Sequence, residues 1–99
     1  MDQVALESNL RSRRFKLLSN EYRLRLLEIL SASEKNVNTL CAELNIEQSL
    51  LSHHLALLRK EDMLVSYRKG KEVYYGISPS IKIKGETHKF DLGCCKVYL

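Results

Sequence analysis

The sequence has no long hydrophobic run, no tryptophan, a single proline and three cysteines in 99 residues. No apolar run approaches the roughly 20 residues that a membrane-spanning helix needs, and the N-terminal segment lacks the apolar stretch of a secretory signal. We therefore expect a cytoplasmic protein with no membrane partner. Three cysteines in that compartment do not indicate a disulfide framework, and the Cys-x-x-Cys spacing of many zinc sites is absent.

Signatures of catalysis are also missing. The sequence has no Gly-rich phosphate loop, and no serine or cysteine is combined with a histidine and a third residue in a recognisable nucleophile arrangement. The sequence therefore predicts that the protein is not an enzyme.

Positive charge is present in excess and in clusters. The formal net charge is +4. The basic clusters are Arg11 to Lys16, Arg23 with Arg25, and Arg68 to Lys71. Basic clusters on separate segments favour a polyanionic partner, although charge alone does not separate DNA from RNA or anionic lipid.

Hydrophobic spacing predicts two helices in the first third of the chain. The first covers residues 3 to about 17 and places Leu6, Leu10 and Leu17 along one face. Asn20 is the predicted N-cap of the second helix, because its side chain can accept from the first backbone N–H groups. The predicted apolar stripe of that second helix consists of Leu24, Leu27 and either Ile29 or Leu30.

A short third helix and a longer fourth helix follow. Either Asn36 or Asn38 is expected to cap the third helix, which carries Leu40, Cys41 and Leu44. The fourth helix is predicted from about residue 47 to 60, with Leu51, Leu55 and Leu58 on its inner side. Two helices joined by the short turn at residues 45–46 predict a helix-turn-helix.

The hydrophobic period then changes from helical to strand-like. Residues 64–68 and 72–77 are rich in β-branched and aromatic side chains and flank a turn at residues 69–71, which predicts a β-hairpin. The expected fold is therefore mainly α with a β-hairpin wing, a winged helix-turn-helix. Residues 1–79 would form this domain, and residues 80–99 a C-terminal tail in which short extended segments are favoured.

The first turns of the fourth helix and the tip of the hairpin are the predicted DNA-binding surface. The candidate residues are Gln48, Ser49, Ser52 and His53 on the helix, and Arg68, Lys69 and Lys71 at the hairpin tip. Glutamine can pair with adenine and the other helix side chains can donate to bases or phosphates, while the basic tip would contact the backbone or a minor groove. A polar first helical turn and a solubilising charged β-turn remain the alternative interpretations.

Several linked motifs in this order resemble the ArsR/SmtB family of winged-helix repressors. Four segments of the chain match the family's pattern. They are the approach Phe15 to Ser19, the run Arg23 to Leu27, the recognition-helix run Gln48 to Leu55 and the wing signature Val73 to Tyr75. The resemblance covers about residues 15 to 77 and implies a sequence-specific DNA-binding repressor that an inducer releases. It also implies a homodimer bound to an imperfect inverted repeat of double-stranded DNA, joined here largely through the N-terminal helix.

The chain departs from the family at the known metal-sensing positions. The Cys-Val-Cys motif found in many relatives is replaced by Asn36-Val37-Asn38, and amides are poor ligands for soft ions. The tail has one histidine, His88, and lacks the Asp-x-His spacing of the relatives that bind zinc on a long last helix. Neither site is expected, and the usual C-terminal dimerisation helix is in doubt.

The adjacent Cys94 and Cys95 are the remaining candidates for a sensing role. One interpretation is a site for As(III), Sb(III) or another thiophilic ion, with Cys41 or a cysteine of the other subunit as a third ligand, because some arsenic-sensing relatives resemble this chain in a C-terminal cysteine pair. A second is a redox-responsive repressor, in which Lys89 and Lys96 lower a thiol pKa. A third is that Cys94 and Cys95 only pack against the body of the domain. Cys41 has a similar interpretation, as a small hydrophobic residue. A winged-helix regulator without a small-molecule inducer, acting through protein partners, is the remaining functional alternative.

Overall fold

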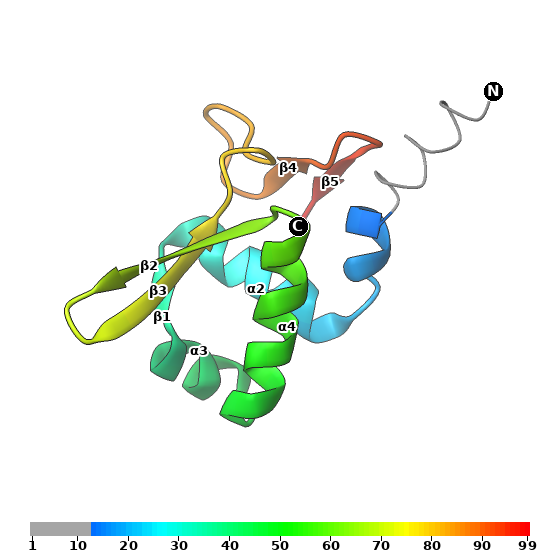
Figure 1. Ribbon diagram of the computed structural model, residues 1–99. Helices are drawn as coiled ribbons and strands as arrows, with labels where there is room; N and C mark the ends of the chain where they lie inside the picture. Colours follow the sequence, from blue (N-terminus) through cyan, green and yellow to red (C-terminus); the bar gives the residue numbers. More distant parts are fainter. Residues whose placement is uncertain (1–12) are drawn as a thin grey trace.

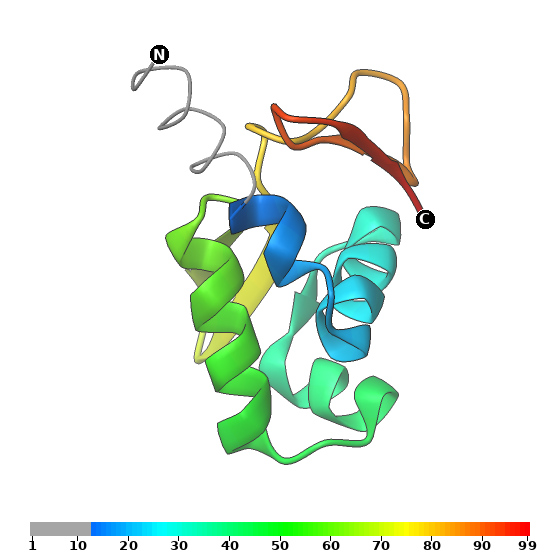
Figure 2. The ribbon, with the colours of Figure 1, turned by 90° about the vertical axis from the view of Figure 1, so that its right-hand side faces the viewer.

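The computed structural model describes residues 13–99. Residues 3–12 of the predicted N-terminal helix, with Leu6 and Leu10, lie outside the described residues, and residues 13–17 are helical. Three further helices pack beside a three-stranded antiparallel sheet, and a second, two-stranded hairpin covers one end of the helices (Figures 1 and 2). The winged helix-turn-helix prediction is confirmed.

Helix α2 (Glu21–Ala32) begins where the sequence predicts it. The Asn20 side-chain oxygen accepts from the backbone N–H groups of Tyr22 (2.9 Å) and Arg23 (3.2 Å). The buried stripe consists of Leu26, Leu27 and Leu30. The prediction that Leu24 belongs to this stripe is wrong in detail: Leu24 is only partly buried, and Leu26 lies in the core instead.

Helices α3 (Val37–Leu44) and α4 (Gln48–Lys60) form the helix-turn-helix. Asn36, rather than Asn38, caps α3, because its side-chain oxygen accepts from the N–H of Thr39 at 2.8 Å. Asn45 ends α3 in the left-handed conformation (φ 54°), which asparagine tolerates better than most residues. After this turn α4 passes in front of α2 in the view of Figure 1.

The wing is built from β2 (Leu64–Lys69) and β3 (Glu72–Ile77), which pair as the predicted antiparallel hairpin, with Lys69 in the strand rather than in the turn. Gly70 adopts φ 66° in the turn between them, a conformation that favours glycine. A two-residue strand, β1 (Lys35–Asn36), pairs with the other edge of β3. Sequence analysis missed β1, because two residues carry no hydrophobic period.

The tail contains the expected extended segments, β4 (Lys89–Asp91) and β5 (Lys96–Tyr98), and no helix lies within residues 80–99. Its Ile81, Phe90 and Leu92 are buried in the same core as the leucines of α2, α3 and α4. None of the helices in residues 13–99 is both long and apolar enough to span a bilayer.

A turn after α4 fastens the tail to the domain. Asp62 adopts φ 54°, its side chain accepts from the Ser78 hydroxyl at 2.8 Å, and its backbone carbonyl accepts from the Ser80 hydroxyl at 2.6 Å. The tail is therefore held by hydrogen bonds at its start and by apolar side chains further along.

Candidate nucleic-acid interface

Helix α4 presents one polar face to solvent and buries the opposite one. Its buried residues are Leu51, His54, Leu55 and Leu58. All four predicted contact residues, Gln48, Ser49, Ser52 and His53, are exposed. The hydrophobic contacts therefore fix the rotation of α4 about its axis, and with it the direction in which these polar side chains point.

His54 links α4 to the start of α2. The side chain is only 4% exposed, and the Arg23 guanidinium donates from Nη1 to His54 Nδ1 at 3.2 Å. Arginine has no acceptor, so Nδ1 must accept and the neutral ring carries its proton on Nε2. Burial lowers the pKa of His54, and the positive charges of Arg23 and His53 act in the same direction. The neighbouring His53, a predicted DNA contact, is exposed instead.

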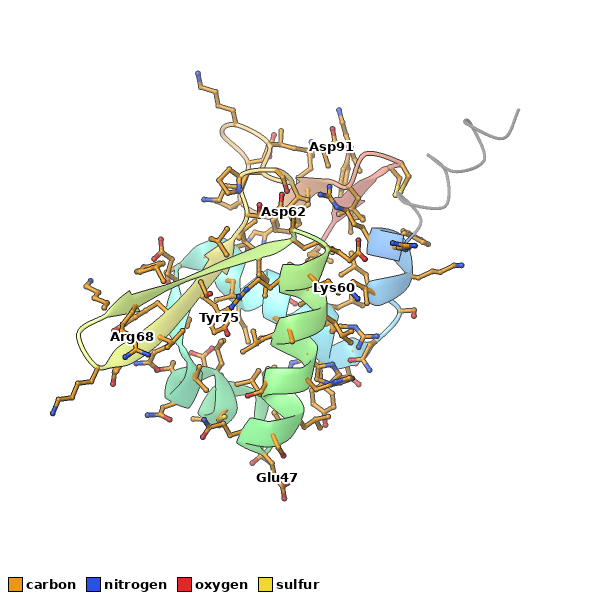
Figure 3. All side chains as sticks on the ribbon, in the orientation of Figure 1. Glu47, Lys60, Asp62, Arg68, Tyr75 and Asp91 are labelled. Carbon is orange, nitrogen blue, oxygen red and sulfur yellow. The ribbon has the colours of Figure 1, made fainter. Side chains whose placement is uncertain are left out.

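The wing is stiffened by contacts on one face of its hairpin. Tyr67 and Tyr74 stack with ring centroids 5.9 Å apart, and the Lys69 amine lies 5.7 Å from the Tyr74 centroid. Glu72 accepts from Asn36 Nδ2 at 2.8 Å, which ties the hairpin to the start of α3. Arg68, Lys69 and Lys71 are all exposed at or beside the tip, where Figure 3 labels Arg68.

The two predicted halves of the surface meet. Gln48 at the start of α4 and Lys71 in the wing line the same hollow of about 210 Å³, together with Asn38 of α3. The structure therefore brings one helix candidate and one wing candidate to the same hollow, whose lining also includes Glu72. It also shows the Arg23–His54 and Asn36–Glu72 links, which sequence analysis missed.

The thiols are not brought together in the same way. Cys94 and Cys95 lie in the turn between β4 and β5, with their Sγ atoms 3.2 Å apart. Cys41 belongs to α3 and packs against the core. Helix α3 and the hairpin of β4 and β5 lie at opposite ends of the molecule in both ribbon views (Figures 1 and 2). Among residues 13–99, no three His, Cys, Asp or Glu side chains form a group that could hold a metal ion.

The electrostatic surroundings of Cys95 differ from those predicted. The hydrogen bond with Cys94 raises the pKa of the Cys95 thiol, and burial and the negative charges of Cys94 and Asp91 act in the same direction. The Lys89 amine lies instead over the Tyr98 ring, 4.6 Å from its centroid, and 3.7 Å from Glu86. The prediction that nearby lysines lower the thiol pKa is wrong for Cys95.

Comparison with known proteins identifies the family. Residues 20–66 match the family described as bacterial regulatory protein, arsR family. The arsenical resistance operon repressor of Escherichia coli is 43% identical over 68 residues, which span 68% of this chain and 58% of that repressor. The structure of reduced HlyU from Vibrio cholerae shares 30% identity with a TM-score of 0.72, covering 81% of this chain and 84% of HlyU.

The chain belongs to the ArsR family. A homodimeric winged helix-turn-helix DNA-binding domain from Mycobacterium bovis, described as a possible ArsR-family regulator, has the same fold, with 26% identity and a TM-score of 0.72 over 78% of this chain and 71% of that domain. Because ArsR-family proteins are transcriptional regulators, the prediction that the chain is not an enzyme is confirmed. In the match to the E. coli repressor, the chain spans less than two thirds of that relative's length.

Proposed function

We propose that this ArsR-family chain is a transcriptional repressor that binds an imperfect inverted repeat of double-stranded DNA as a homodimer. The observation that carries the proposal is the exposed face of α4. Gln48, Ser49, Ser52 and His53 point outward from a helix whose other side is held in the core. In this arrangement the N-terminal half of α4 enters the major groove and its side chains reach the base edges.

The wing supplies affinity that does not depend on sequence. Arg68, Lys69 and Lys71 are exposed beside α4 and are suited to phosphates or to a minor groove. The stacked tyrosines and the Asn36–Glu72 hydrogen bond hold the hairpin in a defined position, so less conformational entropy is lost on binding.

A homodimeric relative and one apolar surface of this chain support the proposed dimer. The M. bovis domain is homodimeric. Phe15, in the helical turn of residues 13–17, is 56% exposed, and it lines a hollow of about 150 Å³ with Leu18, Leu24 and Val97. A second copy covering this hollow would bury Phe15, and a two-fold dimer would match an inverted repeat.

The test is selection of duplexes from a random library by the reduced protein, followed by affinity measurements on the selected repeat. We expect Gln48→Ala to weaken binding to that repeat by about 1–3 kcal/mol while leaving binding to unrelated duplexes unchanged. The double variant Lys69→Ala/Lys71→Ala should weaken binding to the selected repeat and to unrelated duplexes, and it should make the dependence of affinity on salt less steep. Lys84→Ala, at an exposed lysine in the tail, is the control. Failure to enrich any repeat would contradict the proposal and favour a protein partner.

The proposed inducer is a thiophilic metalloid such as As(III) or Sb(III), acting at Cys94 and Cys95. The two sulfur atoms are 3.2 Å apart in an exposed turn, and the E. coli relative is a repressor of arsenical resistance. Cys41 of the same protomer is not close to them, so a third thiolate would come from the partner subunit or from a small thiol. The raised pKa of Cys95 disfavours the thiolate that both metalloid binding and oxidation need, so the pKa does not separate these two alternatives.

Release from the selected repeat distinguishes the inducers. As(III) should release the wild-type protein, and Cys94→Ser/Cys95→Ser should stay bound, with unchanged affinity in the absence of As(III). Cys41→Ser is the matched control, and it should still respond. Release by an oxidant alone would favour the redox-responsive alternative. Release by neither addition would favour a regulator that acts through protein partners.

A further inference from the structure

A crease runs between α4 and the wing, on the side of the helix that carries Ser52. It is a hollow of about 320 Å³, lined by Ser52, Ala56, Arg59 and Lys60 of α4 and by Tyr75 of β3. Figure 3 shows Tyr75 on the hairpin and Lys60 on the neighbouring helix. Sequence analysis assigned no role to Ala56, Arg59, Lys60 or the Tyr75 side chain.

The crease carries two positive charges, and no carboxylate among the described residues forms an ion pair with either. Arg59 and Lys60 are both exposed, and the ion pairs formed between residues 13 and 99 include neither of them. Arg59 Nη1 donates to Ser66 Oγ of β2 at 3.1 Å, so the guanidinium is held across the crease. That bond uses one of its five N–H groups and leaves the others for a ligand. Two full charges also exceed the partial negative charge at the C-terminal end of α4.

The crease continues the proposed base-reading face of α4. Ser52, Ala56, Arg59 and Lys60 are spaced four, seven and eight residues apart, which places them on one side of a helix. Ala56 is exposed and has only a methyl group, so a strand of DNA could approach the helix closely between Ser52 and Arg59.

The geometry of duplex DNA determines what would lie there. When α4 occupies a major groove and the wing reaches the adjacent minor groove, one sugar-phosphate strand separates the two grooves. That strand has to pass between the helix and the hairpin, which is where the crease lies. Phosphate oxygens are matched by a guanidinium, an ammonium group and the hydroxyl groups of serine and tyrosine.

We propose that the crease binds a phosphate group of this strand, with Arg59 as the main ligand and Lys60, Ser52 and Tyr75 beside it. The inference rests on the proposed DNA-binding function and adds a contact to the backbone that is independent of base sequence. It also gives the Arg59–Ser66 hydrogen bond a role, because that bond holds the guanidinium in place before DNA binds.

The experiment compares Arg59→Gln/Lys60→Gln with wild type on the selected repeat and on an unrelated duplex, over a range of salt concentrations. We expect about tenfold weaker binding to both duplexes at low salt and a less steep salt dependence, by about one unit for each lost phosphate contact. Lys82→Gln/Lys84→Gln removes the same charge from exposed positions in the tail and should change neither quantity by a comparable amount.

A second variant separates a DNA contact from a structural role. Arg59→Lys keeps the charge and should retain the salt dependence, with only part of the loss in affinity. Thermal unfolding of each variant checks that the fold is intact. If the double glutamine variant folds and binds as the wild type does, the inference is wrong, and the two cations only stabilise the end of α4. If wild type itself binds no duplex, the proposed function fails and this inference with it.

Discussion

The DNA-binding face and the cysteine-bearing hairpin share one core but are attached to it in different ways. Helix α4 buries Leu51, His54, Leu55 and Leu58 and is also joined to α2 by the Arg23–His54 hydrogen bond. The hairpin of β4 and β5 has three-residue strands, and its main buried anchors are Phe90 and Leu92. The turn between β4 and β5 is therefore held to the shared core by fewer buried side chains than α4 is.

The largest expected effect tests whether the hairpin folds with the rest of the domain. Phe90 is buried in the common core, so Phe90→Ala should lower the free energy of unfolding by about 3–5 kcal/mol. Urea denaturation followed by circular dichroism measures this loss. Tyr98→Ala, on the same hairpin at a side chain that is 69% exposed, is the control and should change stability by about 0.5 kcal/mol or less. Were Phe90→Ala to leave the main transition unchanged, the hairpin would unfold independently of the domain.

A smaller effect is expected at the start of α3, where two asparagines occupy different environments. Asn36 caps α3 and donates to Glu72, so Asn36→Ala should cost about 1–2 kcal/mol. Asn38→Ala makes the same chemical change two residues later, at an exposed helical position, and should be close to neutral. Chemical denaturation measures the free energy of unfolding of both variants. Equal losses in the two variants would show that the assignment of Asn36 as the cap is wrong.

The third prediction concerns pH. Because the pKa of His54 in the folded protein lies below its ordinary value of 6.5, the unfolded chain binds a proton there more readily. The free energy of unfolding should therefore fall as the pH decreases below about 6.5, and His54→Gln should show less of this decrease. His88→Gln, at an exposed histidine before β4, should retain it. Thermal unfolding between pH 7.5 and pH 5.5 measures the dependence, and an equal response in all three proteins would contradict the role of His54.

The smallest effects are expected at the exposed thiol. Cys94→Ser should change stability by about 0.5 kcal/mol or less, because the side chain is exposed. Cys41→Ser makes the same change at a residue that packs against the core, and it should cost about 1 kcal/mol or more. Differential scanning calorimetry of the reduced variants compares the two sites. A larger loss at Cys94 would mean that the hairpin turn supports the domain.

Much of the DNA-binding face could be predicted because its signals are local. The cap at Asn20, the leucines of α4 and the glycine turn of the wing each depend on residues close together in the chain. Cys95 shows the opposite case. Lys89 and Lys96 are close to it in sequence, but Lys89 contacts Tyr98 and Glu86, and Cys94 and Asp91 raise the thiol pKa instead.

The winged helix-turn-helix, the two exposed segments of the candidate DNA-binding surface and the family resemblance could all be predicted from sequence, because hydrophobic period, capping and turn chemistry act over a few residues. Three contacts come from the packing of distant segments: Arg23 with His54, Asn36 with Glu72, and Arg59 with Ser66. Packing also places Cys41 on α3, at the other end of the molecule from the hairpin of β4 and β5 (Figure 1). These relations join segments distant in sequence, and their positions depend on how the helices and the two hairpins pack around one core.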